Sequence, residues 1–143
     1  MSYPSSPYKS KTLIPFRSAH LLPLLVWLFL GTILRLSNLA SLPPWTDEFA
    51  TMVFSLGNSF QTVPLNQLID SDILLQLLQP LPEAGINAVV HHLFAESTHP
   101  PIYFALAHLW MKLFPSESGL VSISAARSLS TLFGIVSIPA VFG

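Results

Sequence analysis

The residues best suited to chemistry are two adjacent carboxylates, Asp47 and Glu48, which come shortly after an uncharged apolar run at 21–34. Ionisable side chains next to a membrane segment are costly and are usually retained for a function. A carboxylate at this place could accept a proton from a hydroxyl group. The competing interpretation is structural, with Thr46 as a helix N-cap and both acids stabilising the first helical turn. The local sequence leaves both interpretations open.

A second candidate is His99, which stands directly before Pro100-Pro101. Proline is well tolerated in the first turn of a helix, so a helix is predicted to begin here. The imidazole could then donate a hydrogen bond or a positive charge to a phosphate held at the helix N-terminus. The simpler alternative is an interfacial histidine that precedes a proline-initiated helix.

Metal binding is a further possibility for the cluster His91, His92, Glu96 and His99. His92 and Glu96 would share one face of a helix, but the spacing matches no established metal motif. We therefore expect no metal site, and the sequence leaves open whether a divalent metal is required. The chain contains no cysteine, which excludes disulfides and thiolate ligands.

The composition is that of a membrane protein. Of the 143 residues only 9% are charged and 51% are apolar, against about 25% charged residues in a typical globular protein. The mean hydropathy is +0.58. A net charge of −1 offers no basic stripe, so we expect no nucleic-acid partner. The expected partner is the lipid bilayer.

The beginning of the chain is read as a leader and an anchor. Residues 1–19 are polar, contain Lys9, Lys11 and Arg17, and are predicted to be a cytoplasmic leader. Residues 20–39 would form about 30 Å of helix, enough to cross a bilayer. Arg35, near the far end, could extend to the interface. A cleavable signal peptide is the alternative, although small residues do not cleanly mark a cleavage site before residue 41.

The distribution of Lys and Arg predicts how the chain is oriented across the membrane. Residues 37–99 contain no Lys or Arg, so the positive-inside rule places the N-terminus in the cytoplasm and 40–99 outside, in a bacterial plasma (inner) membrane. Three apolar stretches in this loop, at 49–56, 65–78 and 86–94, are separated by Gly and Pro and predict short amphipathic helices on the membrane or on neighbouring helices. Asp70 and Asp72 would lie on the solvated edge of the second. A small helical ectodomain is the alternative.

The last part of the chain is predicted to return to the membrane. Residues 100–114 are read as a second transmembrane helix, although they are short for one, and 115–118 as a cytoplasmic turn flanked by Lys112 and Arg127. Residues 121–143 would begin a third span. The expected fold is an all-α, polytopic integral membrane protein, of which this chain is an N-terminal piece.

Taken in order, these motifs resemble the N-terminal part of glycosyltransferase family 39. The resemblance covers about residues 20–143 and rests on an ordered series, which is Arg35-Leu36, Leu39, Pro43–Glu48, His99–Tyr103, His108–Trp110, Ala126–Leu129 and Phe133-Gly134. The family includes protein O-mannosyltransferases and aminoarabinose transferases with the GT-C fold. The Asp-Glu pair is its strongest mark here. Thr98-His99 stands where some relatives have Glu-Lys, which puts a metal contact at that point in doubt.

The resemblance implies a transferase that moves a sugar from a polyprenyl-phosphate carrier to an acceptor hydroxyl at the outer membrane face. Asp47 matches the acidic residue that serves as base or orients the acceptor, and Glu48 matches its supporting partner. His99, and with it Arg35, would bind the carrier phosphate. The acceptor is unknown. The alternative function is a non-enzymatic membrane anchor or assembly subunit, in which Asp47 serves only the helix.

Overall fold

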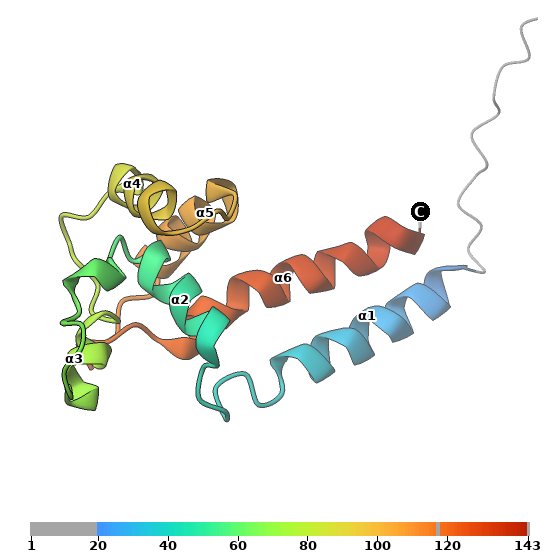
Figure 1. The fold of residues 1–143 in the computed structure, drawn as a ribbon. Coiled ribbons are helices and arrows are strands. Elements are labelled where there is room, and N and C mark those ends of the chain that lie inside the picture. The colour runs from blue at the N-terminus through green and yellow to red at the C-terminus, as the bar shows by residue number, and fades with distance from the viewer. Residues whose placement is uncertain (1–19, 117, 143) are drawn as a thin grey trace, which may run out of the picture.

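The computed structural model describes residues 20–116 and 118–142, and within these ranges it contains helices and no strand (Figure 1). The elements in chain order are α1 (Leu21–Leu36), α2 (Thr46–Ser55), the 3-10 turn η2 (Phe60–Thr62), α3 (Ser71–Gln76), α4 (Ile86–Glu96), α5 (Pro101–Lys112) and α6 (Ile123–Phe142). The predicted all-α class is confirmed for these residues. The leader at 1–19 lies outside them.

The first and last helices form an antiparallel pair that extends away from the other helices (Figure 1). Glycine allows the close approach on both sides: a Cβ atom on Gly31 would lie 2.5 Å from Ile138 Cδ1, and one on Gly134 would lie 2.7 Å from Arg35 Nε. Small residues at a helix–helix contact are typical of packing in a membrane, where close backbone approach replaces the hydrophobic effect.

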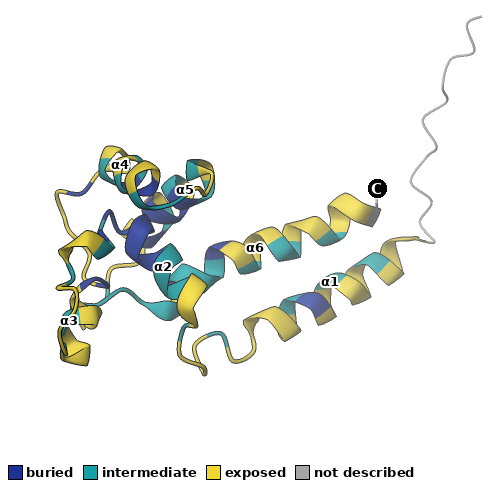
Figure 2. Cartoon of the chain, viewed as in Figure 1, coloured by how far each residue is buried: buried dark blue, intermediate teal, exposed yellow. Residues whose placement is uncertain are grey.

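Both helices of the pair have many exposed residues along their length (Figure 2), and many of these residues are apolar. Leu22 and Leu34 of α1 are more than 70% exposed, and Val136 of α6 is 55% exposed. By length and composition α6 could cross a membrane over Ile123–Val141, whereas α1 is apolar but shorter. No other helix in the described part of the chain meets that criterion.

The remaining helices form a small body around α2. One side of α2 contributes Met52 and Val53 to a core with Leu77 and Leu78. Its other side packs Phe54 against a second core with Val89, Leu93 and Phe104. A helix that is apolar on both sides is expected to lie in the centre of its domain, and α2 does so.

The predicted short helices are present with altered bounds. α2 and α4 match the apolar periodicities at 49–56 and 86–94, but in the stretch 65–78 only Ser71–Gln76 is α-helical. Asp70 caps α3 by accepting a hydrogen bond from the Asp72 backbone N–H at 3.2 Å, and both acids are exposed as predicted. The predicted cap of α2 is wrong, since Thr46 is the first helical residue and no side chain caps the helix.

Helix α5 is the element predicted as a second span over 100–114. It begins at Pro101, as the prolines predict, and its 12 residues rise about 18 Å. Phe104, Ala107, His108 and Met111 are buried, and α5 packs on α2, α4 and α6. Thus α5 is part of the body around α2.

Candidate functional site

The two adjacent carboxylates have different surroundings, because neighbouring residues on a helix point about 100° apart. Glu48 forms a two-point ion pair with Arg127, with Oε1 at 2.5 Å from Nε and Oε2 at 2.8 Å from Nη2. The pKa of Glu48 is lowered, chiefly by the hydrogen bond from Arg127, against a smaller opposing effect of burial. Glu48 is therefore committed to a structural contact.

Arg127 also binds the chain segment between α1 and α2. Its Nη1 donates to the Leu39 carbonyl at 2.8 Å and to the Leu42 carbonyl at 3.0 Å, while Nη2 lies 3.4 Å from the Pro43 carbonyl. A guanidinium carries five N–H donors in a rigid plane, which suits such a set of contacts. Arg127 thus fixes both the linker and the first turn of α2.

The same contacts correct the predicted position of two cations. Arg127 and Lys112 were expected on the inner membrane side, opposite Asp47 and Glu48. Arg127 instead pairs with Glu48, and Lys112 Nζ donates to the Ala84 carbonyl at 2.6 Å. Residues in direct contact cannot lie on opposite sides of a bilayer about 30 Å thick. The structure therefore places Arg127 and Lys112 beside residues of the predicted outer loop, and the side of the membrane on which residues 115–118 lie stays a prediction.

Asp47 is exposed and lines two neighbouring cavities. The first, about 330 Å³, also includes Trp45, Glu48, Tyr103, Arg127 and Ser130. The second, about 310 Å³, reaches Glu96, Ser97 and His99. Thr51 lies on both, and its hydroxyl donates to the Asp47 carbonyl at 2.8 Å. The Asp47 carboxylate forms no ion pair with a described residue, so it is available to a ligand.

His99 and Asp47 both line the second cavity, and His99 lies two residues before α5. Its Nδ1 is 2.6 Å from the Ser97 hydroxyl, and its ring packs 6.0 Å from that of Phe104. His99 also borders a third cavity of about 570 Å³ with Pro100, Ile102, Tyr103 and Leu106. The structure therefore brings together two of the residues singled out from the sequence, Asp47 and His99, and joins their cavity to an apolar one.

Glu96 serves the structure of this site. Its Oε1 accepts a hydrogen bond from the Ser59 hydroxyl at 2.5 Å, and its Oε2 accepts one from the Phe60 backbone N–H at 2.9 Å. His92 Nδ1 lies 3.5 Å from Oε1. The carboxylate thus attaches the 3-10 turn to α4. Within 20–116 and 118–142, no group of three His, Asp or Glu side chains is arranged to hold a metal ion.

Arg35 lies apart from these cavities. Its Nη1 donates to the Gly31 carbonyl at 3.3 Å, and the side chain lies against Gly134 between α1 and α6. It lines none of the three cavities around Asp47 and His99. Its role toward a phosphate remains a prediction.

Sequence reasoning missed the contribution of Arg127, Thr51 and Tyr103. Arg127 had a detectable signal, because it is the one charged residue in the apolar segment 121–143 and a charge there requires a partner. Thr51 and Tyr103 gave no signal beyond helical periodicity.

Comparisons of the chain with protein-family models, curated proteins and solved structures give no match.

The arrangement offers a free carboxylate and an imidazole around one cavity, and the N-terminus of a 12-residue helix borders the neighbouring cavity. A carboxylate can accept a proton from a hydroxyl, and the free N–H groups of a helix N-terminus favour an anion. These groups fit a reaction that removes a proton on one side and stabilises a leaving anion on the other.

Proposed function

We propose that this chain is the N-terminal part of a membrane glycosyltransferase that transfers a sugar from a polyprenyl-phosphate carrier to an acceptor hydroxyl. The observation that carries the proposal is the shared cavity of Asp47, which lies on α2, and His99, which lies two residues before α5. The sequence resemblance to glycosyltransferase family 39 supports it, because Asp47 and His99 are among the residues on which that resemblance rests.

In the proposed reaction, the Asp47 carboxylate accepts the proton of the acceptor hydroxyl. The hydroxyl oxygen attacks the anomeric carbon as the bond from that carbon to the phosphate oxygen breaks, and the phosphate leaves with the electron pair. His99 donates a hydrogen bond to the departing phosphate, whose growing negative charge needs such donors. Attack opposite the leaving group inverts the anomeric configuration.

Glu48 helps to position Asp47, because its ion pair with Arg127 fixes the first turn of α2. The ion pair and the bonds to the Leu39 and Leu42 carbonyls hold the start of α2 against α6. A positioned base is more effective than a mobile one, because orientation removes part of the entropic barrier. Glu48 is thus a positioning residue, and Asp47 is the catalytic one.

The proposed topology is a multi-pass protein of the plasma (inner) membrane with a cytoplasmic N-terminus. Helix α1 would run outward, the body of α2–α5 would lie at the outer face, and α6 would return inward. The antiparallel α1–α6 pair and its exposed apolar side chains support this arrangement. The body, including α5, then replaces the predicted second span.

The test compares sugar transfer by the full-length protein and by Asp47→Asn in membranes supplied with radiolabelled polyprenyl-phosphate sugars. Asparagine has similar size but is a far weaker base, so transfer should fall by about 10²–10⁴-fold. Asp70→Asn is the matched control, since Asp70 is an exposed carboxylate at the start of α3. Unchanged transfer in Asp47→Asn would contradict the mechanism and favour a non-enzymatic anchor or assembly subunit.

A further inference from the structure

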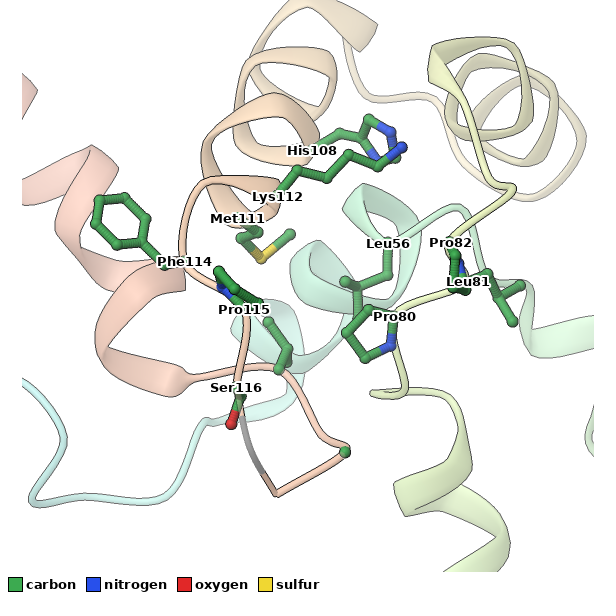
Figure 3. A pocket seen from close by; sticks show the side chains of 12 residues that line it. Leu56, Pro80, Leu81, Pro82, His108, Met111, Lys112, Phe114, Pro115 and Ser116 are labelled. Carbon is green, nitrogen blue, oxygen red and sulfur yellow. The ribbon is translucent and has the colours of Figure 1, made fainter.

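A separate cavity of about 530 Å³ lies at the end of α2 opposite Asp47 (Figure 3). It is bounded by the C-terminal half of α5, by the Pro80-Leu81-Pro82 loop and by residues that follow α5. It shares no lining residue with the three cavities around Asp47 and His99. Most of its lining is apolar and includes Leu56, Leu81, Met111, Phe114 and Val121.

Two nitrogen-bearing side chains of α5, His108 and Lys112, also line this cavity (Figure 3). They are four residues apart and therefore lie on the same face of the helix. His108 is 3% exposed. Its Nδ1 lies 2.8 Å from the Ser55 carbonyl, and because a carbonyl only accepts, Nδ1 must be the donor.

The second ring nitrogen of His108, Nε2, lacks a hydrogen-bond partner in the part of the chain that the structure describes. Nε2 is buried and unpaired among the described residues. Most buried side-chain polar atoms are hydrogen-bonded, because an unpaired one loses its bond to water without replacement. With the proton on Nδ1, Nε2 is an acceptor in the neutral ring, and a group that shares a proton would satisfy it.

Lys112 adds a positive charge to the same face. Its ammonium group uses one N–H for the Ala84 carbonyl at 2.6 Å, and an ammonium has three. No carboxylate is among the described residues that line the cavity. The site thus combines one cation, one proton acceptor and an apolar wall.

We propose that this cavity binds a fatty acid by its carboxyl group and the adjoining part of its hydrocarbon chain. One carboxyl oxygen would accept a hydrogen bond from Lys112 Nζ, and the other would bring the acid's own proton and donate it in a hydrogen bond to His108 Nε2. The apolar side chains would cover the hydrocarbon. A phosphate head group fits less well, because it brings up to two negative charges to a single ammonium. The proposal does not depend on the activity proposed for Asp47.

The experiment uses the full-length protein in lipid nanodiscs and a dodecanoate analogue with a photoreactive diazirine in its chain. After illumination, mass spectrometry of the peptides locates the adducts. We expect adducts on the peptides that contain Leu81 and Phe114, and competition by decanoate but not by decanol. Adducts confined to the exposed faces of α1 and α6 would overturn the proposal, since they would report lipid exposure alone.

Variants at His108 and Lys112 test the contacts proposed for the carboxyl group of the fatty acid. Lys112→Met should weaken competition by decanoate about tenfold, as loss of a charged hydrogen bond predicts, and Lys112→Arg should retain most of it. His108→Asn keeps a donor for the Ser55 carbonyl and removes Nε2, so it should weaken competition to a similar degree. If decanoate competes for labelling of both variants as strongly as it does for labelling of the parent, the proposal is wrong. If either variant fails to fold, the parent protein still tests the proposal. Equal competition by decanol and decanoate for labelling of the parent would overturn it.

Discussion

The carboxylate of Glu48 and the guanidinium of Arg127 form a two-point ion pair across 79 positions of sequence. Their side chains are 22% and 18% exposed, so the pair is shielded from water without being fully buried. It connects the first turn of α2 to the first turns of α6. Through the carbonyls of Leu39 and Leu42 it also fixes the linker that leaves α1. The proposed base, Asp47, stands next to this junction.

Replacement of Arg127 should destabilise the protein. Arg127→Gln removes the ion pair and leaves Glu48 without its partner, which should cost about 1–2 kcal/mol, because bonds to charged groups are strong and the pair is partly screened by solvent. Arg127→Lys should recover less than half of this, since lysine lacks the planar fork. Thermal unfolding of the protein in detergent would measure both. Equal stability of the glutamine variant and the parent would contradict the structural role of the pair.

The pH dependence of stability should follow Glu48. Its pKa is lower in the folded protein than the ordinary value of 4.5, so the pair contributes stability that is fully present above that value. The contribution is lost as the pH falls through the lower pKa of the folded state. Unfolding of the parent and of Glu48→Gln should be compared from neutral to acidic pH. The advantage of the parent should shrink below about pH 4.5, and an advantage that grows there would contradict the assignment.

His99 should affect sugar transfer through the leaving phosphate. In the full-length protein, His99→Ala removes the donor beside the start of α5 and should lower kcat/KM by about 10²–10³-fold, as found when one charge-stabilising donor is removed. His99→Gln retains an N–H donor and should lower it less. His91→Ala is the control, since His91 is an exposed histidine on α4. Equal losses in His91→Ala and His99→Ala would point to a general effect on the fold.

The proposed topology predicts the labelling of single cysteines. The chain has no natural cysteine, so Leu68→Cys in the body and Ser118→Cys after α5 can each be tested with a membrane-impermeant maleimide on intact cells. Both should react from outside, whereas Ser5→Cys in the leader should react only after lysis. Protection of Ser118→Cys in intact cells would restore the cytoplasmic turn that the sequence predicts.

The sequence by itself determined most of the helices. The apolar repeat at 49–56 and the prolines at 100 and 101 predict α2 and the start of α5, because helical periodicity and proline geometry are local properties. The apolar composition likewise predicts exposed hydrophobic faces on α1. The distribution of charge predicts that Asp47 and Glu48 lie beyond the outer end of that helix, which stays a prediction. Each of these inferences depends on residues within a few turns of one another.

Only the tertiary structure decided which ends of the helices meet. The sequence cannot distinguish a short span from a buried helix of similar hydropathy, so α5 was read as a span although it packs on α2, α4 and α6. That interpretation placed Arg127 on the opposite side of the membrane from Glu48, with which it forms an ion pair. The pairing of Asp47 with His99 around one cavity also depends on the path of the chain between them. Contacts between distant segments arise from the packing of whole helices, and no local pattern specifies them.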